Sequence, residues 1–155
     1  MSDYRHAVAP LALGTFAVGT EGLAVAGILP EISTGLHISV SAAGQLVTVF
    51  AVAYALGSPL LAIYGSRFAP KRQLVISLGL FALGNVLAAV TPTYGAMIAV
   101  RVLVALSAAA FVPEASAAGA ALAPPGSRGK ALAVVWGGFT IATVTGVPLA
   151  TFIAG

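Results

Sequence analysis

The stretch SAAGQLVTVFAVAYALGSPLLAIY, residues 41–64, contains no acidic or basic side chain. A helix needs about 20 largely apolar residues to cross the hydrocarbon core of a bilayer, and this stretch is long enough. Its apolar residues show no alternation with a period of two, and lipid admits only helices and closed barrels. The stretch therefore predicts a membrane-spanning helix.

The rest of the chain has the same character. Of its 155 residues, 59% are hydrophobic and 7% are charged, and the mean hydropathy is +1.05. A soluble domain carries about 25% charged residues, so this composition excludes a soluble globular protein. It also excludes a disordered chain, because such chains are poor in apolar residues. The length allows about five spanning helices.

Polar, proline-containing or charged clusters separate five apolar runs, and we expect one all-α transmembrane domain over residues 1–155. The first run has a competing interpretation as a cleaved signal peptide, because Arg5, an apolar stretch and Ala24-Val25-Ala26 resemble its three parts. Four further runs without a soluble domain to export argue against that interpretation. The predicted spans are roughly 7–29, 41–64, 74–90, 94–122 and 131–155.

Basic residues predict the orientation of these spans. The loops after spans one and three contain no Lys or Arg, whereas the other inter-span segments and the N-terminus do. By the positive-inside rule we expect a multi-pass protein of a bacterial-type inner (plasma) membrane, with a cytoplasmic N-terminus and the C-terminus outside. The basic residues of the cytoplasmic side are Arg5, Arg67, Lys71, Arg72, Arg128 and Lys130.

The sequence gives no sign of an enzyme, a cofactor or a metal site. The chain has no cysteine, and His6 and His37 have no partner at metal-ligand spacing. Neither a Walker loop nor a nucleophile with a suitably spaced base occurs, and a net charge of +3 is too small to indicate nucleic-acid binding. Of possible partners, the composition indicates the lipid bilayer.

Three ionisable residues lie inside the predicted spans: Glu21, Arg101 and Glu114. A charged group at the bilayer centre costs about 2.5–3.5 kcal/mol on insertion scales, so we expect each of the three to have a structural or functional role. Counted at 1.5 Å per residue, Glu21 lies roughly 21 Å from the inner start of its span and Arg101 roughly 10 Å from the outer start of its own. Both positions are in the outer half of the bilayer, so the two can pair if their helices are neighbours. Such a pair either couples proton or cation binding to transport, which we favour, or is a static ion pair.

The surroundings of these residues predict close helix packing. Pro113 predicts a kink in the fourth span, and Glu114 after it either lines a cytoplasm-facing cavity or lies near the inner interface in contact with water. Small side chains allow another helix to approach. They are Ala105, Ala108 and Val112 on the face of Arg101, and Gly14, Ala17 and Ala24 around Glu21.

Several stretches are typical of one family. The first span contains GTEGLAVAGILPEI (19–32), and the second contains SAAGQL (41–46) and YALGSPL (54–60). The loop GSRFAPKR (65–72) follows, and RVL (101–103) lies in the fourth span. In this order the stretches resemble the major facilitator superfamily, specifically its drug:proton antiporters and sugar-efflux relatives, over essentially the whole chain.

The resemblance implies roles for the loop between spans two and three. Arg67, Lys71 and Arg72 match the basic residues that latch the two halves of such a transporter in the outward-facing state. The loop departs from the family pattern at Ser66, where an Asp is usual, and at Ala69, where a Gly is usual. These departures put the charge relay of that motif in doubt.

The resemblance also implies a proton-coupling pair. Arg101 matches a fourth-helix arginine linked to proton transfer, and Glu21 lies one residue before the family's usual acidic position, which is Gly22 here. The fifth span resembles the antiporter motif, which forms a bent and closely packed surface against the other half of the transporter. Its residues are Gly137, Gly138, Gly146 and Pro148. Gly138 and Gly146 are about 80° apart around an ideal helix, which predicts that they do not form one strict stripe.

The family has twelve helices in two six-helix halves, and this chain has about five predicted spans. The resemblance therefore implies the N-terminal part of a transporter for proton-coupled efflux of drugs, sugars or other small molecules. A truncated product, a deliberately shortened chain and a half-transporter that assembles with a second half all fit this length. The alternative is a membrane scaffold that does not transport and binds a complete transporter.

Overall fold

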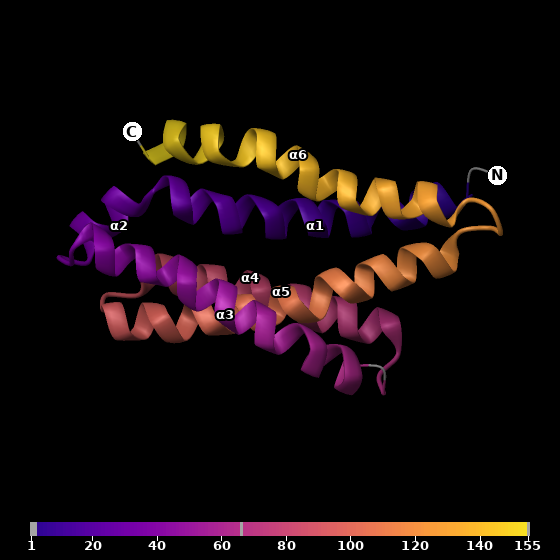
Figure 1. Ribbon diagram of the computed structural model, residues 1–155, viewed down its shortest axis with the longest axis horizontal. Coiled ribbons are helices and arrows are strands. Elements are labelled where there is room, and N and C mark those ends of the chain that lie inside the picture. Colours follow the sequence, from indigo (N-terminus) through magenta and orange to yellow (C-terminus); the bar gives the residue numbers. More distant parts are fainter. Residues whose placement is uncertain (1–2, 66, 155) are drawn as a thin grey trace. The chain divides into compact units, whose positions relative to one another are not determined.

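The computed structural model describes residues 3–65 and 67–154, apart from the side chains of residues 3–5, 147, 149–151, 153 and 154. Every regular element in this part of the chain is a helix (Figure 1). The predicted all-α fold class is therefore confirmed. The helices are α1 (Asp3–Gly27), α2 (Leu29–Gly35), α3 (Val40–Gly65), α4 (Pro70–Val90), α5 (Tyr94–Leu122) and α6 (Arg128–Ala154).

Four helices among the described residues are long and apolar enough to cross a membrane: α1 from His6 to Gly27, α3, α4 and α5. Helix α6 has 27 residues, roughly 40 Å at 1.5 Å per residue, and occupies the place of the fifth predicted span. Many large apolar side chains on α3 and α4 are exposed, which fits helices of a membrane protein. Examples are Val52, Leu56, Leu60, Val75, Leu83 and Val86.

The first helix ends two residues earlier than predicted, at Gly27. The segment after it is the short helix α2 rather than a loop. Pro30 lies in the first turn of α2. Proline has no N–H group and clashes with the preceding turn, so it disrupts a helix interior but fits a first turn. Glu31 lies in the same turn, where a negative charge interacts favourably with the helix dipole.

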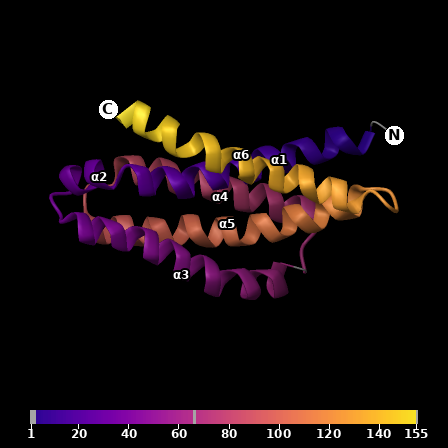
Figure 2. The same cartoon turned by 45° about the horizontal axis from the view of Figure 1, so that its top comes forward.

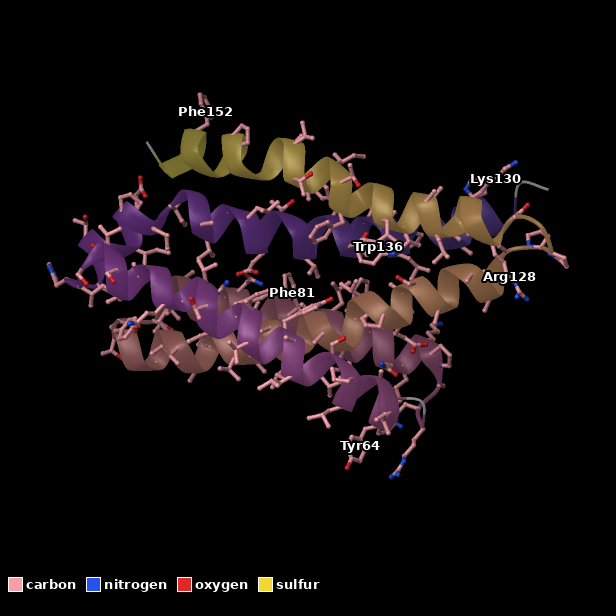
Figure 3. All side chains as sticks on the ribbon, viewed as in Figure 1. Tyr64, Phe81, Arg128, Lys130, Trp136 and Phe152 are labelled. Carbon is pink, nitrogen blue, oxygen red and sulfur yellow. The ribbon has the colours of Figure 1, made fainter. Side chains whose placement is uncertain are left out.

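Helices α4 and α6 begin earlier than predicted, at Pro70 and Arg128 rather than at residues 74 and 131. Lys71 and Arg72 therefore lie in the first turn of α4, not in a loop. Likewise, Arg128 and Lys130 project from the start of α6 (Figure 3). Helices can continue beyond the hydrocarbon core into the headgroup region, where basic side chains stay in contact with water.

The chain divides into two compact units. The first unit contains α1, the part of α5 from Val112 onward, and α6; α1 and α6 lie side by side in it (Figures 1 and 2). The second unit contains α2, α3, α4 and the part of α5 up to Phe111. The division falls next to Pro113, through which α5 continues as one helix. The kink predicted there stays a prediction.

Candidate functional site

Arg101 lies two turns into α5 and is only 3% exposed. Its guanidinium carbon Cζ lies 4.6 Å from the centroid of the Phe50 ring. Its Nε donates a hydrogen bond of 3.5 Å to the backbone carbonyl of Leu46. Both partners belong to α3. The face of an aromatic ring attracts a cation, so the ring and the carbonyl offset part of the cost of burying this charge.

Small side chains surround Arg101 on its own helix. Ala105 and Ala108 are completely buried. Helix α3 approaches the same segment closely at Gly57, where a Cβ atom would lie 2.5 Å from Cδ2 of Leu106. The small-residue face predicted around Arg101 is therefore confirmed, and it allows α3 to come near.

Sequence reasoning missed Phe50. The Phe50 ring is stacked on Tyr54, with ring centroids 6.2 Å apart and an angle of 18° between the planes. The second aromatic ring restricts how Phe50 can turn, so it helps to keep the ring beneath the guanidinium of Arg101. An aromatic residue in an apolar run carries no signal of its own, because only the register between α3 and α5 brings it to the arginine.

Glu21 is half-buried on α1. It belongs to the first unit and Arg101 to the second, so the ion pair predicted between them stays a prediction. The small-residue face expected around Glu21 is wrong in part, because Gly14 is buried but Ala17 is exposed. Larger side chains form most of the buried face of α1, at helical spacing: Val8, Leu11, Thr15 and Val18.

Gly138 and Gly146 both bring α6 against the backbone of α1. A Cβ atom on Gly138 would overlap the carbonyl oxygen of Ala12. A Cβ atom on Gly146 would lie 3.3 Å from Cα of Thr20. Gly137, next in sequence to Gly138, has open space where its Cβ would be. Two glycines of the predicted motif therefore pack closely against α1, and Gly137 does not. The packing against the other half of a transporter that the motif implies stays a prediction.

Gly138 and Gly146 both face α1, although they are about 80° apart around an ideal helix. Ala142 lies midway between them, and its Cβ would be 2.9 Å from a Cβ on Gly19 of α1. Positions 138, 142 and 146 therefore form one row with a spacing of four residues. Such rows are inclined by about 26° to the helix axis, and a neighbouring helix that crosses at an angle can follow them.

A polar contact accompanies this packing. The Thr15 hydroxyl lies 2.5 Å from the carbonyl oxygen of Val135 on α6 and 3.0 Å from that of Ala12 on its own helix, and it can donate its proton to either. Sequence reasoning missed this contact, because a threonine in an apolar run most often bonds within its own helix.

Replacing Thr15 with valine is expected to lower the free energy of unfolding of the detergent-solubilised protein by about 0.6–1.7 kcal/mol, the range of hydrogen bonds between membrane helices. Thr140→Val is the matched control, because the exposed Thr140 hydroxyl bonds to Trp136 of its own helix. Equal unfolding free energies for the two variants would show that the contact between α1 and α6 contributes nothing.

Two other predicted positions lie apart from these contacts. Glu114 is half-buried, one residue after Pro113, and both interpretations of its role stay predictions. Pro148 lies inside α6. Near Pro148, the Phe152 side chain is 85% exposed and points away from α1 (Figure 3).

The basic residues around the end of α3 and the start of α4 are exposed. The Arg67 guanidinium carbon lies 5.4 Å from the centroid of the Tyr64 ring. The Arg72 guanidinium carbon lies 5.9 Å from the centroid of the Phe68 ring. Each arginine is therefore held above an aromatic face, while Lys71 has no ring contact among the described residues.

Comparison with known proteins decides the family. The sequence profile of the Major Facilitator Superfamily matches residues 11–155. The chain belongs to the major facilitator superfamily. The resemblance seen in its motifs is confirmed, and so is the assignment of the fold to part of a major facilitator helix bundle.

Individual members of the major facilitator superfamily are also similar to the chain. It is 42% identical over 144 residues to the uncharacterized MFS-type transporter YbcL of Bacillus subtilis (strain 168), covering 93% of this chain and 37% of that protein. It is 36% identical over 143 residues to the inner membrane transport protein YdhP of Escherichia coli (strain K12), covering 92% and 37%. It is 36% identical over 138 residues to a chloramphenicol resistance protein of Streptomyces lividans, covering 89% and 35%.

The chain thus spans little more than a third of the length of these superfamily members. The YbcL and YdhP relatives are named as a transporter and a transport protein, and the family is one of transporters, so the predicted class of function, a membrane transport protein, has support.

Proposed function

We propose that this chain forms the first helices of a transporter that exports a small molecule in exchange for protons. Membership of the major facilitator superfamily supports the transport. The name of the Streptomyces lividans relative makes chloramphenicol the first substrate to test. The bias of Lys and Arg supports a cytoplasmic N-terminus.

The observation that carries the proposal is the buried guanidinium of Arg101, with Phe50 beneath it and the Leu46 carbonyl beside it. A buried ion pair seldom adds much to stability, because replacing it with well-packed apolar residues often leaves a protein equally or more stable. Ionisable residues inside a membrane mark ion and substrate pathways. A guanidinium over an aromatic face is attracted to that face, and its planar set of N–H donors suits a carboxylate.

Glu21 supplies that carboxylate in the proposed mechanism. In its charged form Glu21 attracts Arg101. When it takes up a proton, the carboxyl group becomes neutral and most of this attraction is lost. Proton binding then favours one arrangement of α1 and α5 over the other, and substrate binding favours the opposite one. A ligand shifts such an equilibrium only by its difference in affinity for the two states, and the charge of Glu21 provides that difference for the proton.

Glu21→Gln is expected to lower proton-driven efflux at least about tenfold, the equivalent of ~1.4 kcal/mol. Glutamine keeps the size of the side chain but can neither carry the charge nor exchange a proton. The measurement is uptake of chloramphenicol into inverted vesicles under an imposed pH gradient, from cells that express the full reading frame containing residues 1–155.

Glu31→Gln is the matched control for this experiment, because Glu31 is exposed in the first turn of α2. It should leave uptake unchanged. Equal uptake by the parent protein and Glu21→Gln would refute the coupling role of Glu21. A parent protein that moves neither chloramphenicol nor a cationic dye would refute efflux and favour the scaffold.

A further inference from the structure

The second unit contains a cleft between α3, α4 and α5, at the end of these helices where the basic residues lie. Its volume is about 520 Å³, within the range of roughly 300–1,000 Å³ that is usual for ligand sites. Tyr64 stands at this end of α3 (Figure 3). The walls are mostly apolar and include Leu61, Ile76, Leu80, Leu103, Leu106 and Ala110.

Gln73 forms the polar part of the cleft and ties the three helices together. Its Nε2 donates a hydrogen bond of 3.2 Å to the carbonyl of Ala110 on α5. Gly65 of α3 packs against the same amide: a Cβ atom on Gly65 would lie 2.5 Å from Nε2 and Oε1 of Gln73. The Oε1 atom of Gln73 is buried and has no hydrogen-bond donor among the described residues. A buried acceptor without a donor is costly, so this amide is a strained point of the cleft wall.

Two arginines give the cleft its charge. Arg72 lines it and lies above the Phe68 ring, and Arg67 lies close by above Tyr64. Both arginines are exposed, and the N–H donors of a guanidinium suit a phosphate. Residues 28–111 contain one carboxylate, Glu31, and it precedes α3. Helix α3 has 26 residues, about 39 Å, so that carboxylate lies at the other end of the unit.

We propose that this cleft binds one anionic phospholipid of the phosphatidylglycerol type. Its phosphate lies at Arg72, and an acyl chain follows Ile76 and Leu80. A lipid fits better than a soluble ligand, because the cleft opens on an apolar surface that a bilayer covers and its polar end lies among interfacial basic residues. Basic pockets between membrane helices on the cytoplasmic side are typical sites for anionic headgroups. The proposal does not depend on proton-coupled efflux.

The test is the number of lipid molecules that the full chain retains. The protein is purified from vesicles with equal amounts of phosphatidylglycerol and phosphatidylcholine, and bound lipid is counted by native mass spectrometry. Arg72→Gln is expected to lower the retained phosphatidylglycerol about fivefold. Arg128→Gln is the matched control, because Arg128 is an exposed arginine in the first turn of α6, and it should change retention less than about twofold.

A second pair of variants tests the apolar part of the cleft. Ile76→Trp fills it, whereas Val75→Trp adds the same ring outside its lining; these side chains are 48% and 64% exposed, so both variants should fold. Only Ile76→Trp should lower retention. If Arg72→Gln and Arg128→Gln lose equal amounts of retained phosphatidylglycerol, the lipid is held by general attraction to basic residues and not by this cleft. Equal retention of the two lipids, or no effect of Ile76→Trp, would overturn the proposal, and so would displacement of lipid by chloramphenicol. If the protein does not transport but still retains phosphatidylglycerol selectively, the lipid proposal holds and the efflux proposal fails.

Discussion

Replacing Gly138 with alanine is expected to lower the free energy of unfolding by about 2–3 kcal/mol, the upper part of the range for overpacking a close contact. The added Cβ atom would overlap the carbonyl oxygen of Ala12 and lie 2.7 Å from the hydroxyl oxygen of Thr15. A backbone carbonyl cannot turn aside as a flexible side chain does, so α6 must move away from α1. The measurement is unfolding of the detergent-solubilised protein, followed by its helical circular dichroism.

Gly137→Ala is the control for this experiment, because a Cβ atom there has open space. Alanine is the better helix former by about 1 kcal/mol, so this variant should be as stable as the parent or more so. Gly146→Ala should lie between the two, since its nearest contact would be at 3.3 Å. The free energy of unfolding is therefore expected to rise in the order Gly138→Ala, Gly146→Ala, Gly137→Ala. Equal stabilities at positions 137 and 138 would contradict the packing of α1 on α6.

The spans could be predicted from the sequence because their signal is compositional. Lipid requires long uncharged runs, and α3, for example, differs from its prediction by one residue at each end. The starts of α4 and α6 could not be predicted in this way. Their first turns are basic, and hydropathy assigns basic residues to loops whether or not the backbone is helical.

Apart from the face of Arg101, helix faces could not be predicted from periodicity. In a soluble helix the polar side indicates which face is buried, but a helix in lipid is apolar on all sides. Gly137 and Gly138 look alike in the sequence, yet only Gly138 meets another backbone. Phe50 is equally inconspicuous until α3 and α5 are in register. Arg101 could be found because a charge inside an apolar run stands out, whatever the helix packing.

Replacing Arg101 with glutamine is expected to lower efflux by at least about a hundredfold. If Arg101 pairs with Glu21 as proposed, stability should also fall by roughly 3 kcal/mol, because the carboxylate is left without its partner. Arg101→Lys should not restore efflux, because an ammonium group lacks the planar set of donors that stacks on Phe50. Phe50→Leu should lower efflux less, whereas Phe50→Tyr keeps an aromatic face beneath the cation. Normal efflux in Arg101→Lys would show that charge alone suffices.

The double variant Glu21→Gln with Arg101→Gln separates the two roles open to this pair. If the residues pair, removing both charges leaves no unpaired ion, and the double variant should recover most of the stability that either single variant loses. A static ion pair predicts that efflux recovers together with stability. Proton coupling predicts that it does not, because no group is left to exchange the proton. Losses in stability that simply add would mean that Glu21 and Arg101 do not interact, and the coupling carboxylate would then have to be another residue, with half-buried Glu114 the first to examine.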